Sequence, residues 1–191
     1  MKERPNLNEL AKEIHNDNKL KGFHDVDWSD EHCLMLAICE LCEAIEADRK
    51  GKKEISKEDI DKMEYITTFH PNNTKLFIYA YQNRIKGSIE EELADAVIRL
   101  LDLAGKRNVY IMLTNGEFYF NKNMNQKTFT EQLYQVVYDL MTISNHLSET
   151  ISIIIAQVEY VCKLKDIDLY THIDLKLKYN KTRPYKHGKE Y

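Results

Sequence analysis

The sequence has little of the two residues that interrupt helices and mark turns. It contains three prolines and six glycines among 191 residues. This scarcity excludes a protein built from many short strands and favours long helices. Cysteine is also sparse. The four cysteines are Cys33, Cys39, Cys42 and Cys162. Their irregular spacing does not suggest a disulfide framework, so we expect reduced thiols and a cytoplasmic location.

Long hydrophobic runs and a strong charge of one sign are missing as well. The longest apolar run, ISIII at 151–155, is far too short to span a bilayer, and the N-terminus is polar. We therefore expect no membrane association. The net charge is only −4, so we expect no stable binding to nucleic acid.

Helix-start and helix-end signals recur along the chain. Asn6 with Glu9, Ser56 with Asp59 and other such pairs have the spacing of capping boxes. These signals predict helices over about 6–19, 29–49, 56–65, 74–86, 88–105, 128–144 and 147–165, with one more after residue 168. With 43% hydrophobic residues, the chain can form one core. We predict an all-α, antiparallel helix bundle in a single domain, 1–191.

One segment departs from the helical pattern. In NVYIMLTNGEFYFNKN, apolar and aromatic residues flank Asn115-Gly116. An Asn-Gly pair in that setting is a strong signal for a tight turn between two strands. We predict a small β-hairpin insertion near 109–120.

Two pairs of carboxylates stand out on the predicted helices. Glu40 and Glu43 are three residues apart, as are Glu92 and Asp95, so each pair projects from one helix face. Most such pairs lie on solvated faces, but apolar and small residues surround these four. A buried acidic cluster needs protonation, basic partners or a divalent metal. Carboxylate oxygens from two helices suit Mg²⁺, with Mn²⁺ as an alternative.

At these residues the sequence resembles the MazG-like, all-α nucleoside triphosphate pyrophosphohydrolases, whose relatives include dimeric dUTPases, dCTP pyrophosphatases and phosphoribosyl-ATP pyrophosphohydrolases. The resemblance rests on KGFHD (21–25), CELCEAIEADRKGK (39–52), EEELADAVIRLLDLAG (90–105) and NKTRPYKHGK (180–189). Segments at about 54–88 and 106–146 are insertions relative to this pattern. Cys39 stands where the family often has a further Glu.

The resemblance implies a reaction and a set of site residues. It implies Mg²⁺-dependent hydrolysis of a (d)NTP to a (d)NMP and pyrophosphate by a homodimer or homotetramer. Glu40, Glu43, Glu92 and Asp95 would bind the metal, and Glu43 would also orient the attacking water. Two basic clusters are candidates for phosphate binding. The first cluster consists of Arg49, Lys50, Lys52 and Lys53. The second consists of Lys176, Lys178, Lys181, Arg183, Lys186 and Lys189.

With the resemblance, we expect Lys178 and Arg183 of these clusters, together with Asn180, to reach the phosphates, with Arg49 as a weaker candidate. Solubilising surface charge is the other interpretation. Trp28 and His24 precede the first metal helix and could form a slot for the base, although Trp28 could equally pin its loop to the core. His24-Asp25 also has the form of a phosphohydrolase dyad, but further ligand histidines are not apparent.

Two other functions remain open at this stage. The chain could be a non-catalytic helical interaction protein on the same fold. It could also be a metal phosphohydrolase that acts on another nucleotide derivative.

Overall fold

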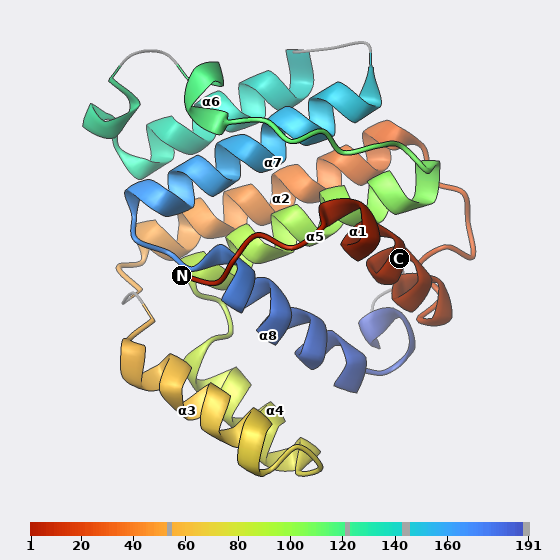
Figure 1. The fold of residues 1–191 in the computed structure, drawn as a ribbon, viewed down its shortest axis with the longest axis vertical. Helices are drawn as coiled ribbons and strands as arrows, with labels where there is room; N and C mark the ends of the chain where they lie inside the picture. The colour runs from red at the N-terminus through yellow and green to blue at the C-terminus, as the bar shows by residue number, and fades with distance from the viewer. Residues whose placement is uncertain (53–54, 121–122, 143–145, 189–191) are drawn as a thin grey trace.

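The computed structural model of the chain describes residues 1–191 except 53–54, 121–122, 143–145 and 189–191. The described part is all-helical, with no strand, so the predicted all-α bundle is confirmed (Figure 1). None of these helices combines the length and apolar character that crossing a bilayer requires. The helices are α1 (Leu7–Leu20), α2 (Asp30–Arg49), α3 (Lys57–Phe69), α4 (Thr74–Arg84), α5 (Ile89–Arg107), α6 (Phe129–Thr142), α7 (Leu147–Leu164) and α8 (Leu169–Thr182).

The predicted start signals are real caps. The Asn6 side chain accepts hydrogen bonds from the backbone N–H groups of Asn8 and Glu9. Ser56 and Asp59 form a complete capping box at the start of α3. Such contacts satisfy the first N–H groups of a helix, which have no partner within it. Helix starts are therefore close to the predicted positions. The predicted end of the sixth helix, near residue 144, lies outside the described residues.

The predicted end of α5 was wrong. The helix continues past Gly105 to Arg107 and ends at Asn108, which adopts a left-handed conformation with φ 50°. A Cβ atom on Gly105 would lie 2.4 Å from the carbonyl oxygen of Ala11 in α1. This glycine therefore permits close contact between two helices and does not end one.

Helix α5 is the centre of the bundle. Helices α1, α2, α7 and α8 all contact it, and α6 packs against α7. Small side chains line the contact between α2 and α5, as the sequence predicts, and let the two backbones approach closely. These residues are fully or almost fully buried: Ala44, Ala47, Ala94 and Ala96.

The predicted insertion at 54–88 contains α3 and α4, which pair with each other beside α8 (Figure 1). They form a smaller hydrophobic cluster that includes Met63, Phe77 and Tyr81, together with Tyr179 of α8. The rings of Tyr81 and Tyr179 stack with centroids 4.2 Å apart. Helix α8 thus contacts both the main bundle and this pair.

The predicted β-hairpin near 109–120 is wrong. This segment runs along α7, and Gly116–Tyr119 forms a short 3-10 helix, η1. Ahead of η1, side chains accept hydrogen bonds from the backbone of the segment: Met112 N–H donates to Ser152 Oγ, and Ile111 N–H donates to Asn8 Oδ1. A Cβ on Gly116 would lie 1.9 Å from the Ala156 carbonyl oxygen. Gly116 therefore allows the segment to approach α7 closely and does not form a turn between two strands.

Candidate functional site

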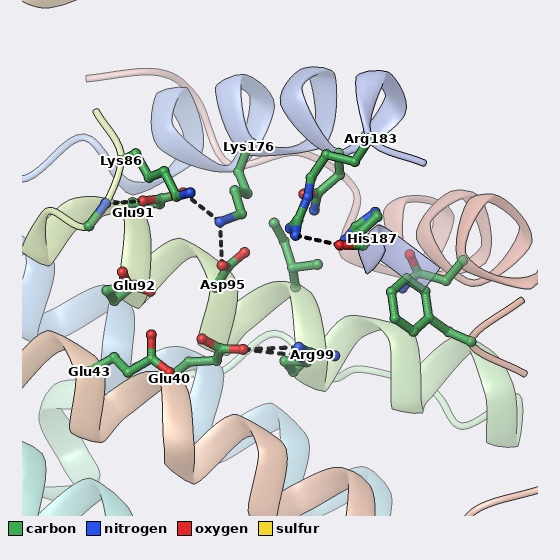
Figure 2. Close-up of a pocket in the computed structure, with 15 residues that line it drawn as sticks. Glu40, Glu43, Lys86, Glu91, Glu92, Asp95, Arg99, Lys176, Arg183 and His187 are labelled. Carbon is green, nitrogen blue, oxygen red and sulfur yellow. Dashed lines mark hydrogen bonds and ion pairs between the residues drawn. The ribbon is translucent and has the colours of Figure 1, made fainter. Parts of the chain in front are cut away.

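A polar cavity of about 250 Å³ lies where α2, α5 and α8 meet. Carboxylates from α2 and α5 form one side, and cations from α8 face them (Figure 2). Each helix has a capped N-terminus, through Ser29, Ser88 and Asp168 respectively. Charged residues that line the cavity are Glu40, Glu43, Lys86, Glu91, Glu92, Asp95, Arg99, Lys176 and Arg183.

Three of the four predicted metal ligands meet in this cavity. Glu40 and Glu43 of α2 and Glu92 of α5 each offer one carboxylate oxygen, and these oxygens lie within 4.8 Å of one another. Glu40 and Glu92 are buried, each 8% exposed, whereas Glu43 is exposed. No cation in the described part lies within ion-pair distance of Glu43 or Glu92. The cluster therefore combines two buried carboxyl groups with one exposed carboxylate, and of the three only Glu40 has a cation partner in the described part.

Asp95, the fourth predicted ligand, forms an ion pair with Lys176. Its Oδ2 lies 2.5 Å from Lys176 Nζ, which also lies 2.5 Å from Glu91 Oε1. Glu91 in turn accepts hydrogen bonds from the Tyr81 hydroxyl, at 3.0 Å, and from the Gly87 N–H. Lys176 thus joins two carboxylates of α5 to α8, and Asp95 is not part of the three-carboxylate cluster.

Arg99 binds Glu40 from the same helix face as Glu92 and Asp95. Its Nε and Nη2 both lie 3.1 Å from Glu40 Oε1. A carboxylate has two oxygens with several lone pairs, so this contact leaves Glu40 capacity for a metal. The ion pair also fixes the direction in which Glu40 points.

The crowding of carboxylates changes their acidity. Burial, followed by the nearby Glu91 and Asp95 charges, raises the pKa of Glu92 to about 8. Burial likewise raises the pKa of Asp95, against the lowering effect of Lys176. For Lys176, burial disfavours the ammonium, but Asp95 and Glu91 outweigh it and raise its pKa. Lys176 therefore stays charged, and Glu92 holds its proton near neutral pH.

The first turn of α5 tolerates this acidity for a further reason. Glu90, Glu91 and Glu92 occupy it consecutively. The N-terminal end of a helix carries a partial positive charge, which stabilises nearby carboxylates. The position of these acids at a helix start is thus favourable before any ligand binds.

The predicted phosphate-binding residues divide into two groups. Asn180 and Arg183 line the cavity, with Arg183 Nη2 donating to the His187 carbonyl oxygen at 3.1 Å. Lys178 is exposed and lines a different, mostly apolar cavity between α8 and the α3–α4 pair. Positions 176, 180 and 183 share one helix face, whereas a residue two positions away points elsewhere.

The remaining predicted site residues lie outside this cavity. Arg49 is exposed and pairs with Glu46 at 3.0 Å. Trp28 and His24 line a separate, smaller cavity, where the Trp28 ring stacks on His32 with centroids 4.4 Å apart. Asp25 accepts a hydrogen bond from the Tyr185 hydroxyl, whereas His24 Nε2 lies 2.8 Å from Asp102 Oδ1. Lys53 and Lys189 of the basic clusters lie outside the described residues.

Sequence reasoning missed several residues of the cavity. Arg99 is four and seven residues beyond Asp95 and Glu92 on the same helix, a spacing that could have identified it. Lys176 was predicted only as a member of a basic cluster, and Phe23 only as part of the KGFHD segment. Lys86 and Asn18 carry no sequence signal that distinguishes them from other surface residues.

Together these residues place carboxyl groups from α2 and α5 opposite cations from α8 in one cavity, an arrangement that suits a metal-bound polyanion. Comparison with models of protein families, with curated proteins and with solved structures found no match to this chain.

Proposed function

We propose that this protein is a Mg²⁺-dependent nucleoside triphosphate pyrophosphohydrolase that converts a (d)NTP to a (d)NMP and pyrophosphate, with Mn²⁺ as an alternative ion. The observation that carries the proposal is the convergence of Glu40, Glu43 and Glu92 opposite Arg183. The resemblance of the two carboxylate helices to MazG-like enzymes supports the same reaction. The proposal includes a cytoplasmic homodimer or homotetramer that forms no stable complex with nucleic acid.

The carboxylate cluster fits a hard divalent cation. Mg²⁺ prefers oxygen ligands, and all three converging donors are carboxylate oxygens. Burial, followed by the nearby Glu91 and Asp95 charges, raises the pKa of Glu92, and Lys176 offsets this rise only in part. Asp95 would join the ligands only if Lys176 released it. When bound, Mg²⁺ would activate a water molecule and stabilise charge on the phosphates.

The chain's own residues would bind and orient the substrate. Arg183 and Asn180 lie on the α8 side of the cavity, where they could donate hydrogen bonds to phosphate oxygens. Lys86 also lines the cavity and adds a cation. Glu43 is exposed and lacks an ion-pair partner in the described part, so it can orient an attacking water and accept its proton.

A nucleotide panel analysed by product type tests the proposal. The full-length protein would be incubated with Mg²⁺ and each common ribo- and deoxyribonucleoside triphosphate. We expect monophosphate and pyrophosphate from at least one of them. Glu43→Gln should lower kcat by ~100-fold or more, in the range for loss of a general base. Glu46→Gln is the matched control, because Glu46 lies on the same helix and pairs with surface cations.

The other outcomes favour other functions. No turnover of any nucleotide, with thermal stability unaffected by Mg²⁺, would indicate a non-catalytic helical interaction protein. Release of inorganic phosphate or a sugar phosphate, with no pyrophosphate, would indicate a metal phosphohydrolase acting on another nucleotide derivative. Equal activity in Glu43→Gln and Glu46→Gln would remove Glu43 from the mechanism.

A further inference from the structure

A second group of metal-ligating side chains lies apart from the carboxylate cluster. It consists of His15 on α1, His24 in the loop that follows α1, and Asp102 on α5. His15 Nδ1 lies 3.2 Å from His24 Nε2, and Asp102 Oδ1 lies 2.8 Å from His24 Nε2 and 3.5 Å from His15 Nδ1. The three side chains are largely buried, with exposed fractions of 22%, 11% and 14%. Three elements thus bring three donor atoms to one point.

The distances among these donors match those around a tetrahedral metal ion. In a tetrahedral Zn²⁺ site, bonds of about 2.0–2.1 Å place neighbouring ligand atoms about 3.3 Å apart. The three separations here, 2.8, 3.2 and 3.5 Å, lie on both sides of that value. An ion could therefore contact all three atoms with only small side-chain movements.

Hydrogen bonds alone satisfy this cluster incompletely. If both rings are neutral and the facing nitrogens of His15 and His24 hydrogen-bond to each other, only one of these two nitrogens carries a proton. That proton cannot serve both this contact and a contact with Asp102, and with a proton on each nitrogen the two N–H groups would repel each other. Neutral imidazole is the form that binds metals.

We propose that His15, His24 and Asp102 bind a divalent transition metal ion, with Zn²⁺ as the best match. Two imidazoles and one carboxylate favour Zn²⁺ over Mg²⁺, which prefers oxygen ligands throughout. The site is therefore chemically distinct from the carboxylate cluster. A fourth ligand, a water or the Cys33 thiol, would come from the adjoining cavity of about 40 Å³, which His24, Cys33 and Asp102 line.

Nearby cations do not oppose this assignment strongly, because carboxylates hold them. Arg99 and Lys106 also line the small cavity. Arg99 is paired with Glu40, and Lys106 with Asp27 at 2.9 Å. Their charges are thus partly neutralised before a metal enters.

A metal here would fasten the loop after α1 to two helices. Phe23 precedes the ligand His24 directly and lines the larger cavity. Its ring also contacts His187, with centroids 4.9 Å apart. Binding a metal to His24 would therefore hold one wall of the larger cavity in place. We assign the ion a structural role at this point of the fold.

Metal titration of the full-length, chelator-treated protein tests the inference. With excess Mg²⁺ present to occupy the carboxylate cluster, Co²⁺ should bind in a one-to-one ratio, with the intense visible absorption of a tetrahedral site, and Zn²⁺ should displace it. His15→Gln and Asp102→Asn should each weaken binding by roughly 100-fold or more, since even outer-shell changes cost 10–100-fold. Zn²⁺ should raise the Tm of the wild-type protein and have little effect on either variant.

Two controls locate the ion. Glu43→Gln removes a carboxylate of the larger cavity, and His70→Gln removes an exposed histidine elsewhere; both should bind Co²⁺ as the wild type does. Circular dichroism of each variant without metal confirms that it folds. Absence of one-to-one binding would overturn the inference. So would wild-type affinity in both His15→Gln and Asp102→Asn, or loss of binding in Glu43→Gln alone.

Discussion

Lys176 Nζ lies 2.5 Å from Asp95 Oδ2 in the interior of the protein. The lysine side chain is 8% exposed, and Glu91, its second partner, is 2% exposed. The ion pairs at this depth join α8 to α5, and the one positive charge partly compensates two carboxylates that burial would otherwise penalise. Lys176 also competes with any metal for Asp95, so it separates Glu91 and Asp95 from the cluster formed by Glu40, Glu43 and Glu92.

Lys176→Met should destabilise the protein strongly. Glu91 and Asp95 would be left buried without a cation, and removing one member of a buried pair costs about 3–5 kcal/mol. Because Asp95 would then be available to a metal, Mg²⁺ should stabilise this variant more than it stabilises the wild type. Urea unfolding with and without Mg²⁺ measures both effects. Lys178→Met, an exposed position on the same helix, is the control, and equal stability of the two variants would contradict the prediction.

Glu92 should make the stability of the metal-free protein depend on pH. Its pKa rises from the ordinary 4.5 to about 8 in the folded state. Between these values the folded protein holds a proton that the unfolded chain has released, so the free energy of unfolding falls as pH rises. Glu92→Gln should therefore be more stable than the wild type at pH 8, by on the order of 1 kcal/mol or more, and equal to it near pH 4.5.

Urea unfolding in the presence of a chelator at several pH values measures this difference. At pH 8, Mg²⁺ should reduce the difference in stability between Glu92→Gln and the wild type, because a bound cation stabilises the ionised Glu92 carboxylate. Glu46→Gln, at the exposed end of α2, should show no such pH-dependent gain. A gain from Glu92→Gln that is the same at every pH would disprove the link to Glu92 ionisation.

Local signals in the sequence were sufficient for most of the fold. Caps such as Ser88, whose side chain accepts from the Glu91 N–H at 3.1 Å, act within four residues, so sequence reasoning can place helix starts. The two glycine errors have the opposite origin. Gly105 and Gly116 are required by close contacts with Ala11 and Ala156, which lie on distant segments that no local pattern identifies.

In the site, too, features set by local sequence could be predicted, whereas contacts between distant segments could not. Glu40, Glu43 and Glu92 could be grouped from helix periodicity and from the apolar residues around them. The pairing of Asp95 with Lys176 could not, because it depends on where α8 crosses α5. The position of Lys178 outside the cavity could have been predicted from helix periodicity. Lys178 and Asn180 are two residues apart on α8, so their side chains lie on different faces of the helix.

Gly105→Ala should destabilise the protein, although alanine normally favours a helix interior by about 1 kcal/mol over glycine. The new Cβ would lie 2.4 Å from the Ala11 carbonyl oxygen and 2.7 Å from the His15 Cβ. Relief of this overlap requires α1 and α5 to separate, with an expected cost of about 1–3 kcal/mol. Thermal unfolding measures it. Asn83→Ala, at an exposed position of α4, should be close to neutral, and a stabilising Gly105→Ala would contradict the close packing of these helices.

Arg183→Gln and Lys178→Gln should separate the two faces of α8 in nucleotide binding. Each removes one positive charge from the same basic cluster, so a general electrostatic attraction would be weakened equally. Only Arg183 lines the cavity that contains the carboxylates. A charge-assisted hydrogen bond to phosphate is worth about 1.5–3 kcal/mol, so Arg183→Gln should raise the KM for the nucleotide by roughly 10-fold or more. Lys178→Gln should leave KM within about twofold, as for a surface charge of small effect. Steady-state kinetics at fixed ionic strength distinguishes the two variants, and an equal rise in KM for both would show that the phosphates bind through diffuse charge outside this cavity.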